Sequence, residues 1–273
     1  MGAPSSIDCG AGFPVVLIPG LPGRWEWLRP AVDALARHFR VLSFSLTDLP
    51  VAGFFDRAVD RVDDLLAVAG ETRAVVAGVS FGGLVAAHYA SRRPRAVSRL
   101  VLASTPSPRW QLSRHEAACI RRPVLTLPLF VARGANRLLP ELLAALPTWS
   151  TRTAFARYYA TVALRRPGSP RKMAAWVRLW MESDIAAECN RIQAPTLVVT
   201  GEPHLDRVVP VASSLDYLRL VPDARHVVMP GTGHLGSVVQ PTAFAEVLRA
   251  FASAPQGRGA EAPLYVEAAP RIH

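Results

Sequence analysis

The chain has 273 residues, half of them apolar, and a formal net charge of +10. This length and composition suit one large α/β domain with an insertion, and they exclude a chain that is disordered throughout. The longest apolar stretch, residues 124–146, is interrupted by prolines and arginines, so we expect no integral membrane segment. The widely spaced Cys9, Cys119 and Cys189 have no metal-binding spacing, and they predict reduced thiols in a cytoplasmic protein.

Nearly all of the excess positive charge lies in one segment. Residues 106–193 contain 14 Lys or Arg and 5 Asp or Glu, a balance of +9, whereas the rest of the chain has a balance of +1. No nucleic-acid-binding motif accompanies this charge, so we expect no nucleic-acid partner. The arginines either cover the outer faces of helices or attract an anionic substrate or lipid surface.

Short apolar, β-branched runs alternate with helical patterns along the chain. This alternation predicts an α/β fold with a mostly parallel, twisted sheet and crossover helices. Most of the runs are continuously apolar, as expected for strands that are covered on both faces. The candidate strands are residues 14–18, 40–44, 74–79, 98–103, 196–200 and 226–229.

A gap of about ninety residues separates the fourth candidate strand from the fifth, which is too long for one crossover connection. Its helical periodicity predicts a helical cap insertion at residues 106–193, between core segments 1–105 and 194–253. Within it, residues 138–146, 153–164 and 173–181 show this periodicity. Residues 254–273 are rich in Pro, Ala and Gly, and they predict a flexible tail.

The strongest local pattern is Gly-Val-Ser-Phe-Gly at residues 78–82, which follows a candidate strand and precedes a helical stretch. A tight strand–turn–helix junction of this kind presents its serine at the edge of the sheet as a nucleophile. Gly78 and Gly82 remove the side chains that would collide across the turn, and Gly83 lets the helix start close to the strand. Ser80 is therefore the predicted nucleophile.

A serine hydroxyl needs a base, and the base needs an orienting carboxylate. Of the seven histidines, only His234 lies in a glycine-rich loop after the last candidate strand. Asp206 lies in the loop after the strand at residues 196–200, and Glu202 in the same loop is its rival. We therefore predict a catalytic triad of Ser80, Asp206 and His234.

An acyl-transfer site also needs two backbone N–H donors for the oxyanion. One is expected from Phe81, directly after the nucleophile, and the other from the Pro-Gly-Leu-Pro-Gly loop at residues 19–23. Pro19 and Pro22 have no N–H, so Leu21 is the predicted second donor.

With these motifs in this order, residues 13–252 resemble the α/β-hydrolase superfamily, in its capped, serine-dependent, esterase-like branch. The sequence departs from that family at Pro19, where members commonly carry histidine. Asp206 stands five residues after Gly201 rather than three, but four before Pro210, as the family favours. Since only about twelve residues precede the first candidate strand, the hairpin that usually occurs there is expected to be missing.

The resemblance implies hydrolysis of a carboxylic ester through an acyl-serine intermediate, without a metal or organic cofactor. We expect a small to medium, partly apolar, small-molecule ester. The same triad serves lactonases, thioesterases, C–C hydrolases, aminopeptidases and cofactor-free haloperoxidases, and a non-catalytic ligand-binding protein is a further alternative. Five tryptophans are expected either to line the substrate pocket or to pack in the core: Trp25, Trp27, Trp149, Trp176 and Trp180.

Overall fold

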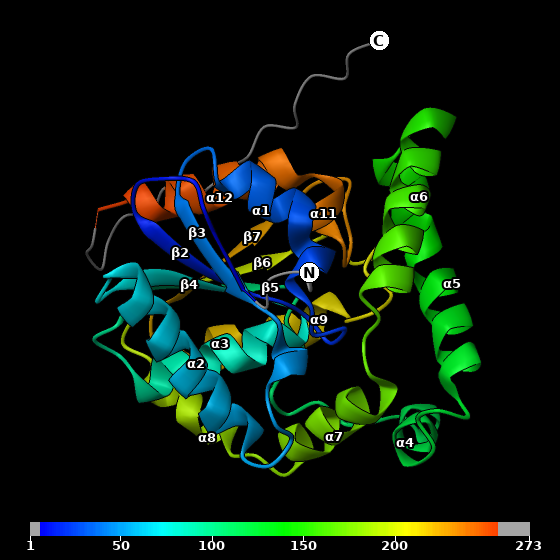
Figure 1. The fold of residues 1–273 in the computed structure, drawn as a ribbon, viewed down its shortest axis with the longest axis horizontal. Coiled ribbons are helices and arrows are strands. Elements are labelled where there is room, and N and C mark those ends of the chain that lie inside the picture. The colour runs from blue at the N-terminus through cyan, green and yellow to red at the C-terminus, as the bar shows by residue number, and fades with distance from the viewer. Residues whose placement is uncertain (1–5, 256–273) are drawn as a thin grey trace.

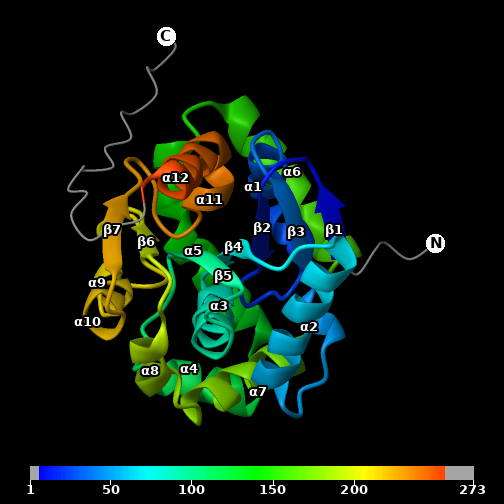
Figure 2. The ribbon, with the colours of Figure 1, turned by 90° about the vertical axis from the view of Figure 1, so that its left-hand side faces the viewer.

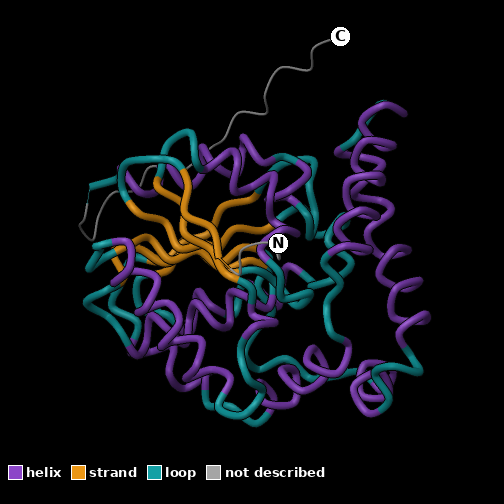
Figure 3. Tube along the Cα trace, viewed as in Figure 1, coloured by secondary structure: helices purple, strands orange, loops and turns teal. Residues whose placement is uncertain are grey.

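The computed structural model describes residues 6–255, and a seven-stranded sheet runs through its centre (Figures 1 and 3). The strand order is β1-β3-β2-β4-β5-β6-β7, and every neighbouring pair is parallel except β1 and β3. The predicted mostly parallel sheet is thus confirmed. The strands are β1 (Ser6–Cys9), β2 (Pro14–Ile18), β3 (Arg40–Phe44), β4 (Ala74–Val79), β5 (Val97–Ala103), β6 (Thr196–Thr200) and β7 (Ala224–Val228).

The bounds of two strands and the presence of a seventh differ from the sequence-based prediction. β5 begins one residue earlier than predicted, and β7 begins two residues earlier and ends one residue earlier. The short strand β1 was not predicted; it pairs with β3 rather than β2, so it forms no hairpin with the first core strand. Its four residues, Ser-Ile-Asp-Cys, are mostly half-buried, and they lack the continuous apolar run that marks a covered strand.

The two faces of the sheet are covered by different helices, as Figure 2 shows. Residues alternate along each strand, so Val16 and Ile18 pack with helices α2 and α3, whereas Val15 and Leu17 pack with α1 and α12. This layering leaves the carboxyl edge of the sheet to the connecting loops. The helices are α1 (Arg29–Leu35), α2 (Phe54–Ala69), α3 (Phe81–Arg92), α9 (Val211–Ser214), α10 (Tyr217–Leu220), α11 (Gly236–Val239) and α12 (Pro241–Ser253).

Helices α4 to α8 lie between β5 and β6, within the predicted insertion at residues 106–193. In Figure 1, α5 and α6 stand to one side of the layered core, whereas α7 lies closer to it. Side-chain caps at Ser113, Thr148 and Ser169 help to start α4, α6 and α7. These helices are α4 (Arg114–Arg121), α5 (Leu127–Ala145), α6 (Trp149–Arg165), α7 (Pro170–Met181) and α8 (Ile185–Glu188).

Two predictions concern the ends and the membrane. Of the tail predicted at residues 254–273, residues 256–273 lie outside the described part of the chain. Across residues 6–255, none of the helices combines the length and the apolar character that crossing a bilayer requires.

Candidate active site

Ser80 occupies the junction between β4 and α3. Its backbone has φ 54° and ψ −125°, a conformation that residues with a side chain rarely adopt. The Ser80 N–H donates to the carbonyl of Ala103 on β5 at 2.8 Å, and the Ser80 carbonyl accepts from Gly83 N–H at 2.9 Å. The sharp turn is therefore fixed by the neighbouring strand and by the first turn of α3.

The glycines around this turn are required by close approach. A Cβ atom added to Gly78 would overlap the carbonyl of Gly82, and one added to Gly82 would overlap the carbonyl of Ile18. A Cβ atom on Gly83 would overlap the side chain of Thr105. The three positions thus hold no side chain for the steric reason that the sequence indicates.

The three predicted triad residues come together at the carboxyl edge of the sheet. Nε2 of His234 lies 3.1 Å from Oγ of Ser80, and Nδ1 of His234 lies 3.4 Å from Oδ2 of Asp206. Asp206 is 3% exposed, and its other oxygen accepts from the backbone N–H groups of Val208 and Val209 at 3.1 and 2.9 Å. This geometry allows the imidazole to take the serine proton while a fixed carboxylate orients the ring.

Of the two predicted oxyanion donors, Phe81 directly follows Ser80, and Leu21 lies in the loop that packs against it. Phe81 is the first residue of α3, so its N–H has no partner within the helix. The loop after β2 packs against the nucleophile, because a Cβ atom on Gly20 would lie 3.3 Å from Cβ and 3.9 Å from Oγ of Ser80. Leu21 follows in a turn that is closed by a 2.8 Å hydrogen bond from Gly23 N–H to the Gly20 carbonyl.

Comparison with known proteins agrees with this architecture. A family profile described as alpha/beta hydrolase fold matches residues 14–241. This chain belongs to the α/β-hydrolase family. It is therefore an α/β-hydrolase enzyme, and the family match covers most of the described residues.

Individual relatives span almost the whole enzyme. A pimeloyl-[acyl-carrier protein] methyl ester esterase of Nitrosomonas europaea is 28% identical over 253 residues, covering 86% of this chain and 94% of its own. The 2-hydroxy-6-oxo-6-(2'-aminophenyl)hexa-2,4-dienoic acid hydrolase of Metapseudomonas resinovorans is 27% identical over 265 residues, covering 90% and 86%. The crystal structure of a hydrolase from Pseudomonas aeruginosa PA01 has a TM-score of 0.71 at 23% identity, covering 91% and 94%, and it shows the shared fold.

Glu202 is the alternative candidate for the acid of the triad. It contacts the backbone of the loop that carries His234 rather than the imidazole. Its Oε1 accepts from Gly231 N–H at 2.8 Å, and its Oε2 lies 3.4 Å from Nδ1 of His204. The Glu202 side chain is 33% exposed, compared with 1% for Asp206. Asp206 is thus the carboxylate that faces the ring of His234.

A third carboxylate, which the sequence did not reveal, reaches the same loop. Glu141 on α5 is fully buried and accepts hydrogen bonds from the backbone N–H groups of Gly233 and Leu235. Burial raises the pKa of Glu141, and the two N–H groups oppose that rise. The available signal was that Glu141 is the one acidic residue in the apolar stretch at residues 124–146.

The five tryptophans predicted for the pocket do not form one group. Trp176 and Trp180 are buried around Phe81, with ring centroids 6.2 and 6.4 Å from it. Trp27 lies elsewhere, and its Nε1 donates to the Arg166 carbonyl at 3.3 Å. Trp25, two residues before Trp27, is buried, whereas Trp149 on α6 is 78% exposed.

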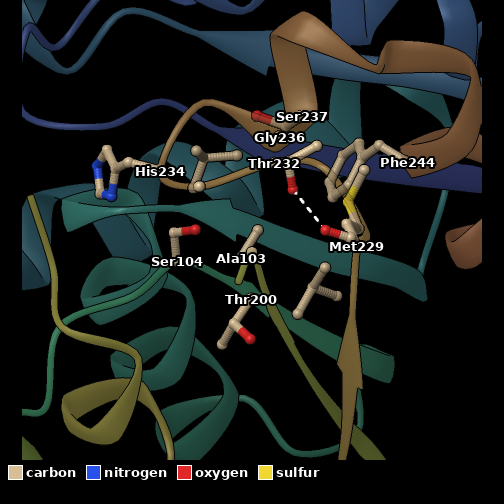
Figure 4. Close-up of a pocket in the computed structure, with 13 residues that line it drawn as sticks. Ala103, Ser104, Thr200, Met229, Thr232, His234, Gly236, Ser237 and Phe244 are labelled. Atoms are coloured by element: carbon tan, nitrogen blue, oxygen red, sulfur yellow. Dashed lines mark hydrogen bonds between the residues drawn. The ribbon is translucent and has the colours of Figure 1, made fainter. Parts of the chain in front are cut away.

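A small cavity lies on the inner side of the histidine loop, as Figure 4 shows. Its volume of about 10 Å³ is about the room that one water molecule needs, so it is too small for an acyl group. The loop above it is fixed by a 2.8 Å hydrogen bond from Thr232 Oγ1 to the Met229 carbonyl. Among residues 6–255, no group of three or more His, Cys, Asp or Glu side chains is arranged to hold a metal ion.

Proposed function

We propose that this enzyme hydrolyses a small to medium, partly apolar carboxylic ester through an acyl-serine intermediate. The observation that carries the proposal is the 3.1 Å separation between Ser80 Oγ and His234 Nε2, with the buried Asp206 on the other ring nitrogen. Ser80 is the nucleophile, His234 the general base and Asp206 the residue that orients and stabilises the imidazolium.

In the first half of the reaction, the Ser80 hydroxyl passes its proton to His234 as Oγ attacks the ester carbonyl. The carbonyl oxygen becomes an oxyanion, which the N–H groups of Leu21 and Phe81 stabilise. When the tetrahedral intermediate collapses, the C–O bond to the alcohol breaks and the alcohol leaves with the proton from His234. The acyl group remains as an ester of Ser80.

In the second half, His234 removes a proton from water as the water oxygen attacks the acyl carbonyl. The bond to Ser80 Oγ then breaks, Oγ takes the proton back from His234, and the carboxylic acid is released. The methyl ester named for the Nitrosomonas europaea relative supports an ester substrate. Lactones, thioesters and C–C bonds are the alternatives that the same machinery accepts, and the substrate panel below compares the first two with esters.

We further propose that residues 106–193 act as the cap over this site. Polar contacts from α6 and α7 support this function, because they reach loops next to the nucleophile. The hydroxyls of Tyr158 and Tyr159 donate to the carbonyls of Glu26 and Trp27 at 3.0 and 3.1 Å. Lys172 Nζ donates to the carbonyls of Thr47 and Leu49 at 2.5 and 3.0 Å. A helical cap held at these points would enclose the substrate and exclude water.

A cytoplasmic location is proposed from the three cysteines, which are free thiols in the structure. Burial raises the pKa of Cys189 to about 12, which makes this thiol unreactive. Free thiols suit a reducing compartment.

The test of the proposed function is Ser80→Ala, assayed with p-nitrophenyl esters from acetate to palmitate beside lactone and thioester substrates. We expect ester hydrolysis to fall by about 10⁴- to 10⁶-fold, as is typical when a triad nucleophile is removed. Ser150→Ala, at an exposed serine on α6, is the matched control and should retain wild-type rates. A Ser80→Ala enzyme that kept a tenth of wild-type activity would contradict the assignment.

A further inference from the structure

The loop that carries His234 is held on both sides of the histidine by a carboxylate from another part of the chain. Oε1 of Glu141 accepts from Gly233 N–H at 2.7 Å and from Leu235 N–H at 2.8 Å. Its Oε2 accepts from Leu235 N–H at 2.9 Å. Glu141 lies on α5, 92 and 94 residues before its two partners, so the contact joins the predicted cap to the catalytic loop.

The burial of Glu141 is costly, so its position needs a reason beyond packing. A carboxylate removed from water loses hydration, which hydrogen bonds and nearby positive charge must offset. An apolar residue would fill the same space without that cost. What the carboxylate adds is direction, because hydrogen bonds to two backbone N–H groups fix where the peptide units around His234 point.

Among residues 6–255, the other carboxylates around His234 do not accept from the N–H groups of Gly233 and Leu235. Asp206, from the loop after β6, contacts the imidazole ring and the backbone N–H groups of Val208 and Val209. Glu202, from the same loop, contacts Gly231 and His204. Glu141 and Asp206 are thus the two buried carboxylates near the imidazole, one on the backbone and one on the ring.

We propose that Glu141 is a positioning residue for His234, and that the active site is complete only when α5 is seated on the core. This inference rests on the proposed function, in which His234 is the base. When α5 is in place, the loop presents Nε2 to Ser80, and the negative charge of Glu141 also favours the imidazolium that forms during attack. When α5 moves away, Gly233 and Leu235 lose their acceptor and the base loses its fixed position.

Two substitutions separate the parts of this function. Glu141→Gln keeps the shape, and one amide oxygen can still accept from both N–H groups, but the charge is lost and an NH₂ group faces Leu235. Glu141→Leu removes every acceptor. Glu182→Gln is the matched control, because Glu182 is an exposed carboxylate at the end of α7 in the same segment.

The first measurement is the rate constant for phosphonylation of Ser80 by a fluorophosphonate, with the labelled residue identified by peptide mass. It is accompanied by kcat and KM for a p-nitrophenyl ester. Because displacing a catalytic group by about 1 Å can cost about 10²-fold, we expect Glu141→Leu to lower kcat by about 10²-fold and Glu141→Gln by about tenfold. KM should change little, and Glu182→Gln should match the wild type.

The second measurement is the pH profile of kcat/KM, which distinguishes positioning from a general loss of structure. In the wild type, acidification protonates Glu141, whose pKa is raised by burial, and so removes the negative charge that holds the loop around His234. Glu141→Gln has no such titration. The acid side of the profile should therefore move to lower pH. A merely loosened fold would lower the profile without moving it.

The outcomes are distinguishable. If both Glu141 variants label Ser80 at the wild-type rate with an unmoved acid side, the positioning function is wrong although the triad stands. If the wild-type enzyme does not label at Ser80, the proposed function is wrong and this inference is wrong with it. If Glu141→Leu does not fold, as judged by circular dichroism, Glu141→Gln decides alone.

Discussion

Helices α5 and α7 belong to the same segment between β5 and β6, but they meet the core in different ways. The 12 residues of α7 bury four apolar side chains: Ala174, Trp176, Val177 and Trp180. The 19 residues of α5 bury one side chain, and it is the carboxylate of Glu141. Of the two helices, α7 thus contacts the core through apolar side chains, and α5 through one buried carboxylate.

The difference separates stability from geometry. Trp176 of α7 stacks on Phe54 with a centroid distance of 4.9 Å, and the hydrophobic contribution of such burial does not depend on direction. The hydrogen bonds of Glu141 are favourable only where the N–H groups point at it. We therefore expect substitutions in α7 to reduce the free energy of unfolding, and substitutions at Glu141 to reduce the catalytic rate.

After removal of the nucleophile, the largest expected effect is that of Asp206, which sets the scale for α5. Asp206→Asn should lower kcat by about 10⁴-fold, because the amide no longer holds the imidazole in the required tautomer or stabilises its charge. Glu202→Gln should cost far less, since Glu202 contacts the backbone of Gly231 rather than the ring. Steady-state kinetics of both variants provide the measurement. If Glu202→Gln lost most of its kcat and Asp206→Asn kept nearly all of it, Glu202 would be the acid of the triad.

The next expected effect tests α7. Trp176→Ala should lower the free energy of unfolding by about 3–5 kcal/mol, since a fully buried indole is removed and a cavity is left. Equilibrium unfolding in urea measures it, and Glu141→Gln should shift the midpoint much less. Val68→Ala, at a side chain that is 89% exposed on α2, is the control for truncation alone. Equal midpoints for Trp176→Ala and the wild type would remove the distinction between the two helices.

The same contrast explains what the sequence could predict. All the strands except β1, and the serine turn, carry local signals, such as continuous apolar runs and the glycines around Ser80, so short patterns predict them. The family resemblance added the order of Ser80, Asp206 and His234. Glu141 stands out locally only as an acidic residue in an apolar stretch, and that signal does not indicate its function, because its partners lie more than ninety residues away. Residue type indicated that tryptophans would be buried, but it did not indicate that Trp149 would stay exposed.

Charge extends the comparison between the helices. On α7, Lys172 is engaged with the carbonyls of Thr47 and Leu49, and Arg178 with that of Ile120. On α5 and α6, Arg133, Arg157 and Arg165 are exposed, and Arg137 is exposed but lies 3.9 Å from Glu116. Some of the +9 balance of residues 106–193 is therefore available at the surface of α5 and α6.

The smallest expected effect decides whether that exposed charge attracts substrate. Attraction of an anionic ester to α5 and α6 raises the encounter rate, and salt weakens it because the Debye length falls from about 10 Å at 0.1 M to about 3 Å at 1 M. We expect kcat/KM for a carboxylate-bearing ester to fall by up to about tenfold over this range. A matched neutral ester, which controls for salt effects on the fold and on Glu141, should change little. Replacing Arg133 and Arg157 by Gln should flatten the profile of the anionic ester, whereas Arg178→Gln on α7 should leave it steep. Parallel profiles for the two esters would show that these arginines are only a solvated surface.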